Sequence, residues 1–104
     1  MYADLPQTGI VAANGTLKLV LKPQGRQTWT VSQVSNTMLN APANATCFVK
    51  KNGVAISPLV PNSDAASGDP AIQVRYVENM SVEWANCTPG AIGQVLWIYD
   101  DGTG

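Results

Sequence analysis

Apolar and polar residues alternate along this chain in short runs that are separated by turn residues. Residues 16–22, for example, place three leucines on one face and Thr and Lys side chains on the other, which is the period of a half-buried β-strand. Similar alternation recurs over 72–76, 81–84 and 93–99. Because no window repeats apolar residues with the period and caps of a helix, the pattern predicts an all-β protein.

The strongest turn signal is Asn52-Gly53, which lies between two β-rich runs. An Asn-Gly pair favours the two-residue turn of a β-hairpin, so residues 46–51 and 54–60 are predicted to pair with each other. Pro58 and Pro61 restrict the second run to the edge of a sheet or to an early exit from it.

Residues 16–22 and 27–37 flank a Pro- and Gly-containing turn and are interpreted as a second hairpin. Within 27–37 the apolar residues change parity, which predicts a β-bulge near Ser32-Gln33. The segment 62–70 is polar, rich in small residues and ends in a proline, so it is predicted to be the longest loop.

About seven short strands with frequent turns are the pattern of an antiparallel two-sheet sandwich, either immunoglobulin-like (Ig-like) or jelly-roll-like. A small closed barrel is the alternative. Residues 1–14 are expected to form an N-terminal arm, 15–100 the sandwich of about seven to eight strands, and 101–104 a short tail. Whether Ile10-Val11 adds an eighth strand, or the arm docks on a partner, stays open.

The composition adds a sparsely charged surface to this picture. Charged residues make up 12% of the 104 residues, about half the usual share, and the net charge is -1. This gives no long-range field to attract nucleic acid. A surface built from Ser, Thr, Asn, Gln and apolar side chains suits contact with protein neighbours, although a neutral Asn- and Thr-rich domain is the alternative.

The first residues lack the basic and apolar regions of a secretory signal, and no run reaches the length of a membrane span, so we expect synthesis in a cytoplasm and no membrane contact. Cys47 and Cys87 are the two cysteines. They are too few and too far apart for a zinc site. Either they form a disulfide, or they pack as two buried thiols.

Candidate chemistry is scarce. The chain has no histidine, which excludes His-based acid-base catalysis and catalytic triads, and it has no phosphate-binding glycine motif. The carboxylates of 62–70 match no EF-hand spacing. We therefore expect no enzymatic activity, cofactor or metal. Trp29, Trp84 and Trp97 share parity with aliphatic residues of their strands, which favours core packing over a sugar-binding platform.

Three segments together resemble small virion proteins of tailed phages that infect actinobacteria. They are Asn14-Gly15-Thr16 leading into 25–31, the Cys47-containing run 45–49, and 81–91, which ends in Pro89-Gly90-Ala91. The resemblance spans most of the chain. It implies a non-enzymatic structural protein of the virion, of the kind described as minor tail or accessory capsid proteins.

From this resemblance we expect a module that decorates the capsid or tail and binds other copies of itself and the major capsid or tail proteins. A phage-tail adhesin that binds a host-surface glycan is the alternative. The contacts are expected in the arm, in the 54–60 strand and in the 62–70 loop. The residues concerned are Tyr2, Leu5, Pro6, Val54, Ile56, Leu59, Asp64 and Asp69.

Overall fold

The computed structural model describes residues 1–61 and 65–102, with the backbone alone over 65–71. These residues form eight β-strands: β1 (Tyr2–Ile10), β2 (Leu17–Leu21), β3 (Thr28–Met38), β4 (Thr46–Lys51), β5 (Val54–Leu59), β6 (Ala65–Arg75), β7 (Met80–Ala85) and β8 (Ile92–Asp100). The predicted all-β class is confirmed. The described part of the chain contains no helix with the length and apolarity needed to cross a bilayer.

The strands pair as a single long hairpin that has been rolled up. β1 pairs with β8, β2 with β7, β3 with β6 and β4 with β5, and every pair is antiparallel. The tip of the hairpin is the predicted Asn52-Gly53 turn, where φ is 53° and 80°, as a type I′ turn requires. Further pairing of β3 with β8 and β4 with β7 gives two four-stranded sheets, β1-β8-β3-β6 and β2-β7-β4-β5.

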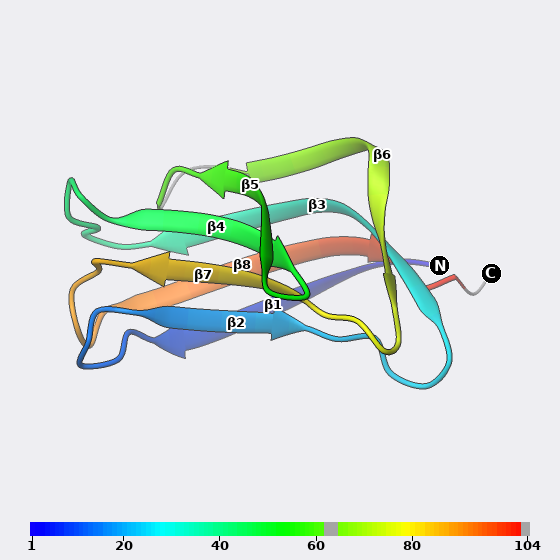
Figure 1. The fold of residues 1–104 in the computed structure, drawn as a ribbon, viewed down its shortest axis with the longest axis horizontal. Coiled ribbons are helices and arrows are strands. Elements are labelled where there is room, and N and C mark those ends of the chain that lie inside the picture. The colour runs from blue at the N-terminus through cyan, green and yellow to red at the C-terminus, as the bar shows by residue number, and fades with distance from the viewer. Residues whose placement is uncertain (62–64, 103–104) are drawn as a thin grey trace.

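The two sheets pack face to face, as Figure 1 shows. This confirms the predicted sandwich, and the rolled-hairpin strand order is that of a jelly roll. β5 lies at the edge of its sheet, where the prolines of the 54–60 run placed it. The predicted bulge is also present, because the register of β3 shifts between Val31 and Gln33 against both of its neighbours.

Three sequence-based expectations differ from the structure. The predicted hairpin of 16–22 with 27–37 is wrong, since β2 and β3 lie in different sheets and their connection crosses between them. Residues 2–10 of the expected arm form β1 and pair along their whole length with β8. The predicted loop at 62–70 is shorter, because β6 begins at Ala65. In each case a non-local strand partner decided the outcome.

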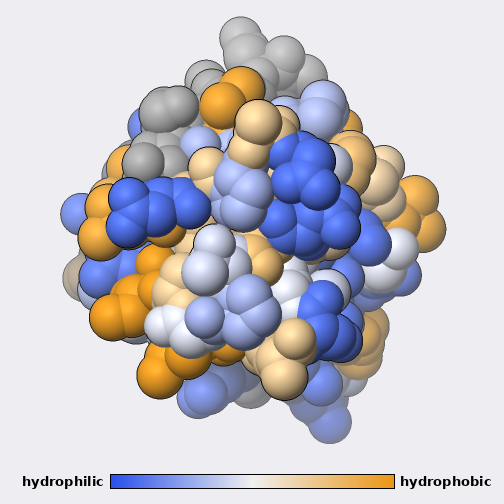
Figure 2. All heavy atoms as spheres, turned by 90° about the vertical axis from the view of Figure 1, so that its left-hand side faces the viewer, coloured by the Kyte–Doolittle hydropathy of each residue, from blue (hydrophilic) through white to orange (hydrophobic). Residues whose placement is uncertain are grey.

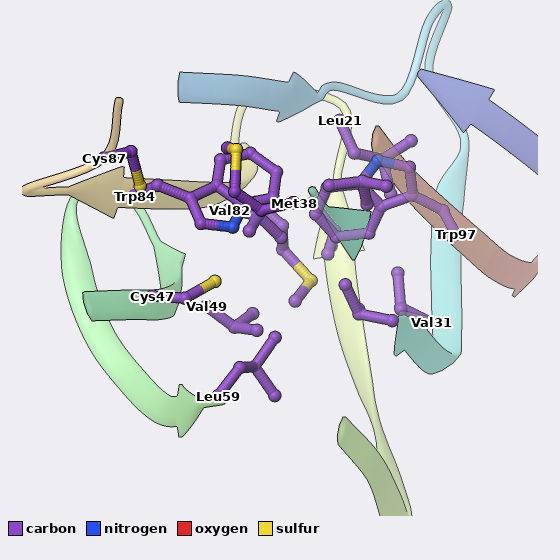
Figure 3. Close-up of a cluster of buried hydrophobic side chains, with 14 of the residues drawn as sticks. Leu21, Val31, Met38, Cys47, Val49, Leu59, Val82, Trp84, Cys87 and Trp97 are labelled. Carbon is purple, nitrogen blue, oxygen red and sulfur yellow. The ribbon is translucent and has the colours of Figure 1, made fainter. Parts of the chain in front are cut away.

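The core lies between the sheets. Both contribute inward-facing side chains, and Figure 3 shows Trp84, Val82 and Val49 of one sheet facing Met38 and Trp97 of the other. Trp84 and Trp97 are 1% and 0% exposed, so their prediction as core residues is confirmed.

At one place the sheets approach closely because two glycines face inward. Gly9 of β1 pairs with Gly93 of β8, and both lie beneath Leu17 of β2. A Cβ atom on Gly93 would lie 2.6 Å from Leu17 Cδ2 and 2.7 Å from Met38 Cε. The glycines therefore make room for leucine side chains of the opposite sheet.

Hydrogen bonds tie the hairpin tip to the β6–β7 connection. Asn52 and Asn79 exchange two of them: the Asn52 N–H donates to the Asn79 carbonyl at 2.9 Å, and the Asn79 N–H donates to Asn52 Oδ1 at 3.1 Å. Lys51 Nζ donates to the Gln73 carbonyl at 2.7 Å and lies 3.5 Å from Glu78 Oε2. Through these contacts the hairpin tip is fixed against both sheets.

Glu78 supplies the pH dependence of this contact. The Arg75 N–H donates to Glu78 Oε2 at 3.0 Å and, with Lys51, holds the pKa of Glu78 below its usual value of 4.5. A carboxyl with a lowered pKa in the folded state stabilises the fold above the unfolded-state pKa, and this stabilisation disappears as the pH falls through the folded-state value. We expect Glu78→Gln to lower the urea midpoint slightly at pH 7, with a smaller difference at about pH 3.

The control for lost negative charge is Asp4→Asn on the exposed face of β1. A Glu78→Gln difference that stays constant over this pH range, or that Asp4→Asn reproduces, would contradict the role given to Glu78.

Candidate partner-binding surfaces

The contact residues expected in β5 do not share one environment. Val54 and Ile56 are 66% and 43% exposed, so both side chains are accessible to a partner. Leu59 was expected beside them, but it is 7% exposed and pairs with Cys47, facing the core. The reason is a register shift in β5 opposite Val49 and Lys50, which changes the parity between Ala55 and Ser57.

The N-terminal contact residues also divide. Tyr2 is 75% exposed and Pro6 is exposed on the outer face of β1. Leu5, in contrast, faces inward opposite Trp97 and packs partly buried against the core, so less of its side chain is accessible to a partner. Asp64 and the side chain of Asp69, expected as loop contacts, lie outside the described residues.

The sheet edges are protected against pairing with another strand. Three edge strands contain a proline, which lacks the N–H that a neighbouring strand would need: Pro6 in β1, Pro58 in β5 and Pro70 in β6. The fourth edge strand, β2, is five residues long and lies against β1, whose Gln7 Nε2 donates to the Val20 carbonyl at 2.6 Å. We therefore expect side chains, and not strand edges, to form the contacts with a partner.

Trp97, Tyr99 and Trp29 offer little exposed ring surface on which a sugar could stack. Trp97 is completely buried, and its Nε1 donates to Gln7 Oε1 at 2.9 Å. Tyr99 is half-buried and stacks on Trp29 with ring centroids 4.3 Å apart. This stacked pair packs against the core.

Both cysteines are buried thiols, which is the second of the two alternatives drawn from the sequence. Cys47 pairs across the sheet with Trp84, whereas Cys87 follows β7, so the two cysteines are not cross-strand partners. Figure 3 shows Cys47 on a strand and Cys87 on the segment that follows β7. Cys87 Sγ lies 3.6 Å from the Ala85 carbonyl, and burial raises the pKa of its thiol, which makes it a poor nucleophile.

Two carboxylates at the molecular surface, those of Glu78 and Glu83, are paired with lysines. Glu83 Oε1 lies 3.4 Å from Lys50 Nζ on the outer face of the β2-β7-β4-β5 sheet, and Glu78 is bound by Lys51. Among the described residues, no three His, Cys, Asp or Glu side chains gather as metal ligands would. These carboxylates act as structural partners of lysines.

An apolar row not anticipated from the sequence crosses one end of the molecule. Ile10 of β1 pairs with Ile92 of β8, and Leu39 follows directly after the Met38–Gly93 pair of β3 and β8. Ile10, Ile92 and Leu39 are 67%, 50% and 59% exposed. Figure 2 views this end of the sandwich and shows hydrophobic residues at several places around its rim, with hydrophilic and neutral residues between them. Three neighbouring aliphatic side chains exposed to this extent are typical of a contact surface.

A shallow hollow of about 430 Å³ adjoins this row. It is lined by Leu39, Asn40, Ile92 and the turn Thr88–Ala91. The turn contains Gly90 with φ of 85°, in agreement with the type II turn predicted at Pro89-Gly90. The sequence signal for this surface was the lack of charge in the connecting segments, which only the topology brings together.

Fold and surfaces together define a small jelly-roll β-sandwich with exposed apolar side chains and two glutamates paired with lysines. No family model matches the chain, and no curated protein matches it. Among solved structures, a crystal structure of FLHE is similar, with a TM-score of 0.56 and 14% sequence identity over 94% of this chain and 96% of that chain. At this identity the similarity shows the fold alone.

A second similar structure is the crystal structure of dimeric latent PorU from Porphyromonas gingivalis. It has a TM-score of 0.36 and 11% identity, and covers 96% of this chain and 13% of that chain. This similarity is too low to support an argument about fold or function.

Proposed function

We propose that this chain is a non-enzymatic structural module of a bacteriophage virion, which binds the capsid or tail surface and other copies of itself. The observation that carries the proposal is the strand order β1-β8-β3-β6 and β2-β7-β4-β5. Viral capsid proteins are among the principal users of this jelly-roll architecture. Since a fold hosts many functions, the surface and the sequence must support the proposal independently.

The surface supports it through its exposed apolar residues and its few charges. Besides the Ile10, Ile92 and Leu39 row, Val54 and Val60 are 66% and 59% exposed near the two ends of β5. Protein interfaces are depleted of charged residues in their centres, and this chain is 12% charged. The resemblance of residues 14–16, 25–31, 45–49 and 81–91 to virion proteins of actinobacterial phages points to the same class of partner.

The test is to follow the chain in the particles themselves. An antibody raised against the purified chain is applied to density-gradient fractions of a lysate from cells that carry its gene. We expect the chain in the fraction that contains phage particles, and at a constant ratio to the major capsid or tail protein. A chain found only among free proteins at the top of the gradient would contradict the proposal.

Glycan binding is the second proposal, and it depends on a different surface. Tyr76, which is 42% exposed, lines a hollow of about 590 Å³ together with Lys22 and Gln24. An exposed ring beside hydrogen-bonding groups can stack on a sugar. Host cell-wall glycan should then quench tyrosine fluorescence of the chain but not of Tyr76→Ala, and equal quenching of both would contradict this alternative.

A further inference from the structure

A hollow of about 450 Å³ lies on the outer face of the β2-β7-β4-β5 sheet and shares no described residue with the Tyr76 hollow. Lys18 of β2, Glu83 of β7 and Phe48 of β4 line it. They are cross-strand partners, so they form one row over strands that Figure 1 shows side by side. Because alternate residues of a strand share a face, all three side chains point away from the core. We call this feature the Phe48 hollow.

Short side chains next to this row make the hollow. Ala85 pairs with Thr46 of β4, and Thr16 directly precedes β2. All three line the hollow beside the longer side chains of the row. The Phe48 ring is 37% exposed and is therefore accessible to a ligand that enters there. An exposed aromatic ring with polar groups around it can pack against the ring of a sugar.

Glu83 is held in place at both of its carboxylate oxygens. Its Oε1 lies 3.4 Å from Lys50 Nζ, and its Oε2 accepts a hydrogen bond at 3.2 Å from Oγ of Ser81, which is completely buried. An ionised carboxylate offers about four acceptor sites, so Glu83 can still accept hydrogen bonds from hydroxyl groups, and the Lys50 ammonium can donate to others. A donor and an acceptor fixed side by side suit a ligand with neighbouring hydroxyl groups, and their fixed positions reduce the entropy lost on binding.

Lys18 gives the hollow a net positive charge. Among the charged residues that line it, Lys50 and Glu83 neutralise each other. The Lys18 side chain is exposed, and within the part of the chain that the structure describes it has no ion-pair partner. One unpaired cation beside a polar and aromatic hollow favours a ligand with a singly charged anionic group, such as a carboxylate.

We infer that the Phe48 hollow binds a uronate, which is a ring sugar with a carboxylate group, within a glycan chain. The sugar ring packs on Phe48, its hydroxyl groups bond to Glu83 and Lys50, and its carboxylate lies near Lys18. The volume of the hollow is within the roughly 300–1,000 Å³ of small-molecule sites. Because the hollow is open to solvent, a single site binds weakly. Copies displayed together on one particle would bind a long glycan more tightly.

Titration of the isotope-labelled chain with tetragalacturonate or a hyaluronan tetrasaccharide, followed by the NMR shifts of backbone amides, tests the inference. We expect saturable shifts centred on Lys18, Phe48 and Glu83. The methyl ester of tetragalacturonate keeps the sugar rings but lacks the charge, so it should bind up to about fivefold more weakly. About 500 mM NaCl should weaken binding of the acid toward that of the ester.

Variants at the surface identify the side chains responsible. Phe48→Ala should weaken binding of the acid by about five- to tenfold, through loss of the ring contact. Lys18→Gln should abolish the difference between the acid and its ester. The matched controls are Lys22→Gln and Tyr76→Ala, which change the Tyr76 hollow and should keep the wild-type affinity. Amide spectra of the free variants establish that each one is folded.

Three results would overturn the inference: no saturable shift with either glycan, equal affinity for the acid and its ester, or a loss of binding in Tyr76→Ala that matches the loss in Phe48→Ala. The inference goes beyond the proposed structural role, and the two fail separately. A chain that occurs in phage particles but binds no uronate contradicts only the Phe48 hollow. A chain that binds uronate but never occurs in particles contradicts only the virion role.

Discussion

Truncation of Trp97 to Ala should remove about 3–5 kcal/mol from the free energy of unfolding, which is a large share of the roughly 5–15 kcal/mol of a domain this size. The indole is 0% exposed and lies on β8, one of the two central strands of its sheet, in register with Leu5 of β1 and Val34 of β3. A smaller side chain leaves a cavity that a two-sheet core cannot close from either side. Trp84→Ala should have a comparable effect, because Trp84 is 1% exposed in the opposite sheet.

Replacement by Phe should destabilise the protein to different extents at the two tryptophan positions. Trp97 Nε1 donates to Gln7 Oε1 at 2.9 Å, so Trp97→Phe leaves a half-buried amide oxygen without its donor. Trp84 Nε1 is buried with no hydrogen-bond partner among the described residues. Since an unsatisfied buried polar group costs about 1–3 kcal/mol, Trp84→Phe should be the better tolerated change by about that amount.

Urea unfolding followed by far-ultraviolet circular dichroism measures both pairs of variants without depending on the tryptophan signal. Gln7→Leu is a control at the acceptor: it removes the partner of Trp97 together with the Gln7 bond to the Val20 carbonyl, and neither bond involves Trp84. The interpretation fails if Trp84→Phe is as destabilising as Trp97→Phe.

The local features of the fold were visible in the sequence. Asn52-Gly53 predicted the hairpin tip, the alternation in 16–22 predicted the inward face of β2, and the parity change in β3 predicted its bulge. Each depends on backbone preferences or on a two-residue period that neighbouring residues determine.

Features of the fold that depend on strand partners distant in sequence could not be predicted from the sequence. β1 was hidden because its inward positions include Ala3, Gln7 and Gly9, which break the apolar alternation of a strand. Gln7 is nevertheless suited to its place, since it bonds Trp97 and the Val20 carbonyl. The crossing from β2 to β3 between sheets was read as a hairpin because a turn signal does not report which sheet the next strand joins.

The candidate binding surfaces also have some features that the sequence predicted and others that depend on the fold. Long uncharged stretches are plain in the sequence, and exposure of Val54 and Ile56 followed from their edge strand. The apolar row at one end of the molecule depends on rolling the hairpin so that three of those stretches meet. Likewise, Leu59 was assigned to the surface because the parity shift in β5 depends on its pairing with β4.

Adding a side chain at Gly93 should produce the second large loss of stability. Gly93 stands at an inward position of β8, where alternation would place an aliphatic residue beside Val95 and Trp97. A Cβ there would meet Leu17 Cδ2 at 2.6 Å and Met38 Cε at 2.7 Å. Gly93→Val should therefore cost about 1–3 kcal/mol by overpacking, even though valine is a better strand former than glycine.

The effect should depend on the size of the new side chain. Gly93→Ala should be milder than Gly93→Val, because the atoms in its way are the far ends of the flexible Leu17 and Met38 side chains. Gln94→Val, on the exposed face of the same strand, is the matched control. It gains the same β-propensity without entering the space between the sheets.

A double-mutant cycle tests whether the collision with Leu17 is the cause. Leu17→Ala opens the space above Gly93, so Gly93→Val should cost less in that background than in the wild type, and the two changes should not be additive. Urea unfolding of the four proteins gives the coupling energy. Additive effects would mean that the close approach of the sheets at the Gly9–Gly93 pair does not depend on the absence of side chains there, and that the destabilisation arises elsewhere in the strand.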